Sequence, residues 1–77
     1  MPEVARFGNC KVCMYADKHW RPHFHIRGPG WDVSVDLETF DIIVGKGDGV
    51  AIEQALKWAR ENQAQLYAEW GRLNERE

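Results

Sequence analysis

Two segments with strict alternation of apolar and polar residues flank the turn sequence Gly28-Pro29-Gly30. In the first segment, residues 23–27, the histidines alternate with Phe24 and Ile26. In the second, residues 31–37, every odd-numbered position is apolar and the positions between them are Asp, Ser and Asp. A period of two is typical of strands with one buried face. The pattern therefore predicts an antiparallel hairpin with a polar face and an apolar face.

Matching the apolar faces of the two segments fixes their register. The predicted pairs run from Arg27 opposite Asp32 to His23 opposite Asp36, because a shift by one residue would mix polar and apolar side chains on each face. A two-residue or a four-residue loop satisfies this register. We expect the four-residue loop, since Pro29 suits ordinary turns better than the primed turns of two-residue hairpins.

The rest of the chain predicts a single α+β domain, residues 1–77. Alternation and turn residues predict a small antiparallel sheet of about four strands, arranged as a meander over residues 9–15, 23–27, 31–37 and 40–44. Asp48 is a suitable N-cap for one long C-terminal helix over residues 49–74, which carries an apolar stripe at 3.6-residue spacing. The polar run at residues 60–63 interrupts that stripe and indicates a kink.

Composition restricts the classes of function. A chain of 77 residues has room for one modest core, so a homodimer or a partner protein that completes the core is expected. The net charge of −2 argues against a general nucleic-acid binder. Neither a targeting signal nor an apolar run long enough for a membrane helix is visible, which predicts a cytoplasmic protein with no membrane contact. In that compartment Cys10 and Cys13 stay reduced, and they are expected to be small buried or half-buried hydrophobes.

The candidate site is the stretch from His19 to His25, which holds every histidine of the chain. His23 and His25 lie two residues apart, so on a strand both rings leave the same face, which we expect to be exposed to solvent. A neutral and a protonated imidazole on one face can act as general base and general acid near neutral pH. Asp36 could orient His23 through a ring N–H in the predicted register.

Such a catalytic site would suit cleavage of RNA without a metal or other cofactor. The cations that could hold a phosphate there are Arg21, Arg27 and Lys11.

A metal site is the first alternative. His-x-His on a strand chelates divalent ions, and His19 with His23 and His25 would give three ligands for Zn, Ni or Fe. Asp36 is another candidate third ligand. A site that also uses Cys10 and Cys13 fits less well, because a strand directs those two side chains to opposite faces.

A protein-interaction surface without chemistry is the second alternative. Histidine, Trp20 and Arg21 together are typical of interface anchors, and Trp58 is either a flank of the core or a partner contact. The remaining hypothesis is that the histidines merely solvate the outer face of the sheet.

The chain also resembles a known family, the small bacterial domain-of-unknown-function family numbered forty-one-sixty. The residues that carry the resemblance are Met1-Pro2-Glu3, Arg6-Phe7-Gly8, His19, Pro22-His23-Phe24-His25, Trp58-Ala59, Gln63, Leu66 and Trp70. The sequence departs from the family pattern at Arg21, where a second proline is common, and in Cys10 and Cys13. Members are often encoded beside a partner from another uncharacterised family, in an arrangement similar to toxin–antitoxin modules. The resemblance therefore implies a toxin-like component of a type II toxin–antitoxin pair, with a cognate antitoxin-like partner.

Overall fold

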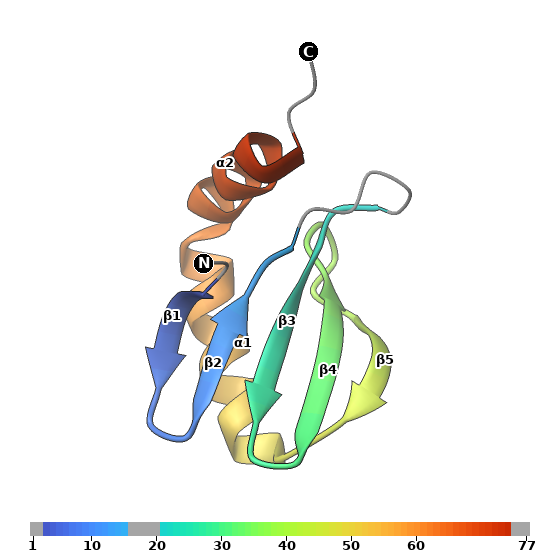
Figure 1. Cartoon of the computed structure of the whole chain (residues 1–77), viewed down its shortest axis with the longest axis vertical. Coiled ribbons are helices and arrows are strands. Elements are labelled where there is room, and N and C mark those ends of the chain that lie inside the picture. Colours follow the sequence, from blue (N-terminus) through green and yellow to red (C-terminus); the bar gives the residue numbers. More distant parts are fainter. Residues whose placement is uncertain (1–2, 16–20, 75–77) are drawn as a thin grey trace.

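The structure is a computed structural model that describes residues 3–15 and 21–74. A five-stranded antiparallel sheet is followed by two helices (Figure 1). The elements are β1 Glu3–Phe7, β2 Cys10–Cys13, β3 His23–Gly28, β4 Trp31–Asp36, β5 Ile42–Lys46, α1 Gly49–Glu61 and α2 Gln63–Asn74. The strands are ordered β1-β2-β3-β4-β5, so each pairs only with its neighbours in sequence. The predicted α+β class and meander are confirmed.

The prediction of about four strands is wrong, because β1 was missed. Its residues Glu3–Phe7 carry two charged side chains, and its register with β2 shifts between Glu3 and Ala5. This irregularity breaks the alternation that marks the other strands. The expected strand at 40–44 also lies later in the chain, at Ile42–Lys46.

The central hairpin has the predicted register, with β3 and β4 paired from His23 opposite Asp36 to Arg27 opposite Asp32. The expected four-residue loop is wrong, because Gly28 and Trp31 also pair and leave only Pro29-Gly30 as the turn. Gly30 has a φ of 76°, and proline followed by a left-handed glycine is the combination that a type II turn favours.

One long helix was predicted, and the structure has two. Asp48 caps α1 as expected, since its carboxylate accepts hydrogen bonds from the amides of Val50 and Ala51. α1 ends at Glu61 with Asn62 as its C-cap, inside the polar run that indicated a kink, and α2 starts at Gln63. Gln63 explains the position of the new helix, because its side-chain amide donates to the carbonyl oxygen of Leu37 at 3.0 Å.

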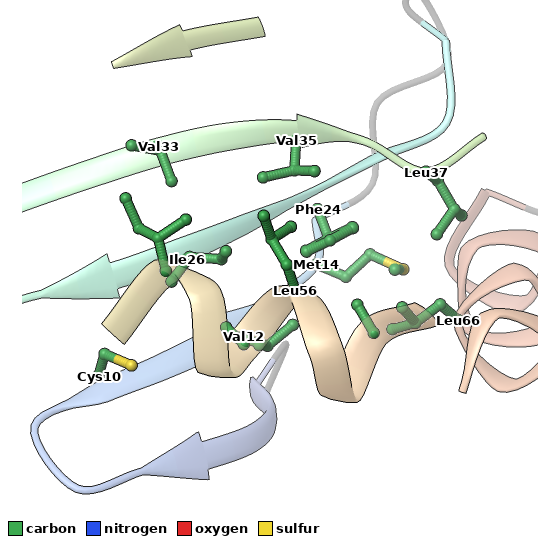
Figure 2. Close-up of a cluster of buried hydrophobic side chains, with 13 residues drawn as sticks. Cys10, Val12, Met14, Phe24, Ile26, Val33, Val35, Leu37, Leu56 and Leu66 are labelled. Atoms are coloured by element: carbon green, nitrogen blue, oxygen red, sulfur yellow. The ribbon is translucent and has the colours of Figure 1, made fainter. Parts of the chain in front are cut away.

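The core lies between the sheet and α1. Side chains from the middle strands point toward the helix in Figure 2, among them Phe24 and Ile26 from β3. The fully buried core side chains of the strands and the loop residues beside them are Cys10, Val12, Met14, Phe24, Ile26, Val33, Val35 and Leu37. Leu56 of α1 and Leu66 of α2 close the cluster. The opposite face of the sheet carries the histidines.

Candidate functional site

His23 and His25 stand side by side on the sheet face that points away from α1. Their ring centroids are 5.3 Å apart and the rings meet edge to face at 69°. Both leave β3 on the side opposite Phe24, as the alternation predicts. The expectation that both rings are exposed is wrong for His23, which is only 3% exposed, whereas the side chain of His25 is 21% exposed.

His23 is held from two sides. Its Nδ1 atom lies 2.9 Å from the carbonyl oxygen of Arg21, and because a carbonyl can only accept, this nitrogen carries the proton. The indole of Trp70 packs against the ring, with centroids 5.2 Å apart. Trp70 is partly buried at the edge of the core, and from there it also covers His23. One of the contacts that cover His23 thus comes from α2, and no local sequence pattern predicts it.

The carboxylate of Asp36 accepts its hydrogen bonds from Arg21 and from the loop after β4, rather than from His23. One carboxylate oxygen accepts from Nη1 of Arg21 at 2.9 Å, and the other accepts from the amides of Glu38 and Thr39. The expected hydrogen bond from His23 to Asp36 is replaced by the one to the Arg21 carbonyl. The Arg21 guanidinium, helped by the two amides, lowers the pKa of Asp36 although burial opposes the shift.

His25 has a different carboxylate beside it. Its Nδ1 atom lies 3.3 Å from Oδ1 of Asp32 and 3.4 Å from the hydroxyl oxygen of Ser34, which is its partner across the strand pair. The ring of Tyr15 meets the imidazole edge to face, with centroids 5.1 Å apart. A carboxylate that accepts from Nδ1–H leaves Nε2 as the nitrogen that can take a proton.

Arg27 completes this part of the site. Its guanidinium donates to the hydroxyl of Tyr15 at 3.0 Å and lies 3.3 Å from Oδ2 of Asp32. The hydrogen bond to Tyr15 and the charge of Asp32 raise the pKa of Arg27, so the side chain stays charged. Tyr15, His25, Asp32 and Arg27 therefore form one connected polar cluster on the exposed face.

The remaining predicted site residues divide into three groups. His19 and Trp20 lie outside the described residues. Trp58 is remote from the histidines, because it lies on α1 and packs edge to face against Phe7 at 5.9 Å. Lys11 lies on the histidine face, since it pairs with Arg27 across the strands. Within residues 3–15 and 21–74, no group of three or more His, Cys, Asp or Glu side chains is placed to hold a metal ion.

Both cysteines are buried, as expected. Cys10 belongs to the core, whereas Cys13 pairs with His25 and lies on the histidine face. Burial and the nearby Asp48 raise the pKa of the Cys10 thiol, which disfavours a nucleophilic role.

Four residues of the site were not among the predicted site residues: Tyr15, Asp32, Ser34 and Trp70. The signal for Ser34 was present, because the predicted register places it opposite His25. Parity along β2 likewise places Tyr15 on the same face as Cys13. The predicted register placed Asp32 only opposite Arg27. Its contact with His25 is diagonal, because His25 itself pairs with Ser34.

The fold and the site together define a small α+β domain with a histidine-bearing sheet face. The chain matches the model of a family described as Domain of unknown function (DUF4160) over residues 10–71, and it belongs to that family. No curated protein and no solved structure matches the chain. Neither helix in the described part of the chain is long and apolar enough to cross a membrane.

Proposed function

We propose that this protein is a cytoplasmic, toxin-like component of a bacterial type II toxin–antitoxin pair and that it cleaves RNA through His23 and His25. The observation that carries the proposal is the pair of imidazoles 5.3 Å apart, with the charged Arg27 in the same polar cluster as His25. Two adjacent histidines can divide the roles of general base and general acid, and a neighbouring guanidinium can hold the phosphate.

The reaction needs no metal and no co-reactant. Nε2 of His25 accepts the proton of the ribose 2′-hydroxyl, and the 2′-oxygen forms a bond to the adjacent phosphorus. The bond between phosphorus and the 5′-oxygen breaks, and protonated His23 donates its proton to that leaving oxygen. The products are a 2′,3′-cyclic phosphate and a 5′-hydroxyl end. Arg27 stabilises the negative charge that builds up on the phosphoryl oxygens.

The two histidines take these roles because of their surroundings. Asp32 accepts from Nδ1 of His25 and stabilises the imidazolium that forms when Nε2 takes a proton. His25 is also the more exposed of the two rings, so it is the more accessible to a substrate. His23 is covered by Trp70, and the indole must move aside for the leaving oxygen to reach it.

The direct test is incubation of the purified protein with a labelled single-stranded RNA in the presence of EDTA. We expect cleavage with 2′,3′-cyclic phosphate ends, and no cleavage where a 2′-deoxynucleotide replaces the reacting one. His25→Asn should lower the rate by about 10²-fold or more, whereas Lys57→Gln, an exposed change on α1, should not alter it. Cleavage that persists in folded His25→Asn, or that EDTA abolishes, would contradict the proposal.

The toxin role is tested in cells. Expression of the wild type should arrest bacterial growth, and co-expression of the protein encoded by the adjacent gene should relieve the arrest. The double variant His23→Asn/His25→Asn should be harmless while circular dichroism shows that it folds. A folded double variant that arrests growth as strongly as the wild type would show that the histidines are not responsible.

One observation favours a second candidate, a non-catalytic interaction module. β5 is an edge strand, and its side chains Ile42 and Val44 are 45% and 59% exposed. Exposed apolar side chains on an unpaired edge suit the addition of a partner strand. Capture of the neighbouring gene product by the wild type, lost in Ile42→Thr/Val44→Thr but kept in His25→Asn, would support this role, and capture that both variants retain would contradict it.

A further inference from the structure

A row of basic residues crosses three strands next to the histidine cluster. Arg6 of β1 pairs with Lys11 of β2, and Lys11 pairs with Arg27 of β3. Residues directly opposite each other in an antiparallel sheet project from the same face, with Cβ atoms about 5 Å apart. Three positive side chains are thus neighbours on the face that carries the histidines.

The same three residues line a shallow hollow in the surface. It has a volume of about 390 Å³, and its walls are completed by Asn9 and by the β3–β4 turn at Gly28 and Pro29. The donors in the walls are two guanidinium groups, an ammonium group and a side-chain amide. Within the described residues, no carboxylate lines this hollow.

The positive charge of the row is only partly balanced. Arg6 is paired with Glu3 at 3.0 Å, and Arg27 lies 3.3 Å from Asp32. Lys11, in the middle, has no ion pair with any residue in the described part of the chain. Like charges placed directly opposite each other destabilise a sheet, so this arrangement favours an anion bound over Lys11.

We infer that the hollow formed by Arg6, Lys11 and Arg27 binds a phosphate of single-stranded RNA next to the phosphate that is cleaved. This inference rests on the proposed ribonuclease function and extends it with a second phosphate-binding position. Arg27 belongs both to the hollow and to the histidine site. It lines the hollow, and it lies two residues from His25 on the same face of β3, about 6.8 Å along the strand. The RNA backbone would therefore run along β3, from the hollow toward His23.

Single-stranded RNA fits this surface better than an acidic protein segment does. The rings of Tyr15 and His25 lie beside the basic row and can stack against unpaired bases.

The test measures binding of a fluorescent single-stranded hexanucleotide with 2′-O-methyl groups, which the protein cannot cleave. Lys11→Gln and Arg6→Gln are each expected to weaken binding about fivefold to tenfold at low salt. Each should also reduce the slope of log affinity against log salt by about 1. The matched control is Lys57→Gln, which removes the same charge from α1 and should bind as the wild type does.

A thermal measurement separates binding from folding. Because Lys11→Gln removes repulsion within the row, its Tm without RNA should be equal to or higher than that of the wild type. Weaker binding with an unchanged or raised Tm supports the subsite, and a lowered Tm in parallel with weaker binding overturns it.

Two outcomes separate this inference from the proposed function. If Lys11→Gln and Arg6→Gln bind the hexanucleotide as tightly as Lys57→Gln does, the subsite is wrong, while cleavage by the wild type still stands. If the wild type neither binds nor cleaves RNA, the proposed function fails and the subsite with it. Titration with pyrophosphate, followed by amide NMR shifts, should move the signals of residues 6, 11 and 27 first. Shifts that spread evenly over the surface would also overturn the subsite.

Discussion

The side-chain amide of Gln63 donates a hydrogen bond to the carbonyl oxygen of Leu37, 26 residues earlier in the chain. This contact joins the first residue of α2 to the loop that follows β4. It also explains the polar run that interrupts the helical apolar stripe, because Gln63 has a partner on the sheet. The bond therefore links the start of α2, the helix that carries Trp70, to the loop after β4.

Gln63→Ala should destabilise the protein by about 1 kcal/mol, because the Leu37 carbonyl loses its donor in a partly buried place. Urea denaturation followed by circular dichroism measures the free energy of unfolding. Gln65→Ala, an exposed change on the same helix, is the control and should have little effect. Equal stability of the two variants would show that the bond contributes nothing.

Gly47→Ala should destabilise the protein by about 1–3 kcal/mol, because a Cβ atom at residue 47 would overlap the indole ring of Trp31. A Cβ atom at Gly28 would overlap other atoms of the same indole ring, so both glycines leave room for Trp31. Gly49→Ala is the matched control, since nothing lies within 4 Å of the added atom and alanine favours the helix. The measurement is the Tm of both variants in thermal unfolding. A Gly47→Ala variant as stable as Gly49→Ala would contradict the packing of Trp31.

Asp36 should make the stability of the protein sensitive to acid. Its folded pKa is lowered by Arg21, so it stabilises the fold above the ordinary carboxyl pKa of about 4. That stabilisation is lost as the pH falls from about 4 through the folded pKa. The free energy of unfolding, measured from pH 2 to 7, should fall less steeply in acid for Asp36→Asn than for the wild type. Asp41→Asn, an exposed change in the same loop, should leave the acid slope unchanged.

Cys10 and Cys13 should be unreactive in the native protein, because both are buried and the pKa of Cys10 is raised by its burial. Alkylation with iodoacetamide at pH 8, followed by mass spectrometry, should label neither thiol until urea unfolds the chain. Rapid labelling of either cysteine under native conditions would contradict the burial that the structure shows.

Much of the sheet could be predicted because its signals are local. The alternation around Gly28-Pro29-Gly30 gives the register of β3 and β4, and the cap at Asp48 gives the start of α1. β1 escaped prediction because its register shift hides the alternation. The loop of the central hairpin escaped because the left-handed conformation of Gly30 allows a turn of only two residues.

The site was predictable where the alternation of side chains along a strand determines which of them share a face. The shared face of His23 and His25 follows from their spacing, and the position of Ser34 opposite His25 follows from the register. The contact of Trp70 with His23 could not be predicted, since Trp70 lies 47 residues later, on a separate helix. The role of Asp36 was also hidden, because its turn amides compete with His23 for the same carboxylate.

The strictly sequential order of the strands has a consequence for synthesis of the protein. A ribosome delivers β1 to β5 in the order in which they pair, so every hydrogen-bonded ladder can form without waiting for a later strand. The apolar side of this nascent sheet stays uncovered until α1 leaves the exit tunnel. A translation pause before residue 49 would therefore leave this apolar face exposed to chaperones and to other nascent chains.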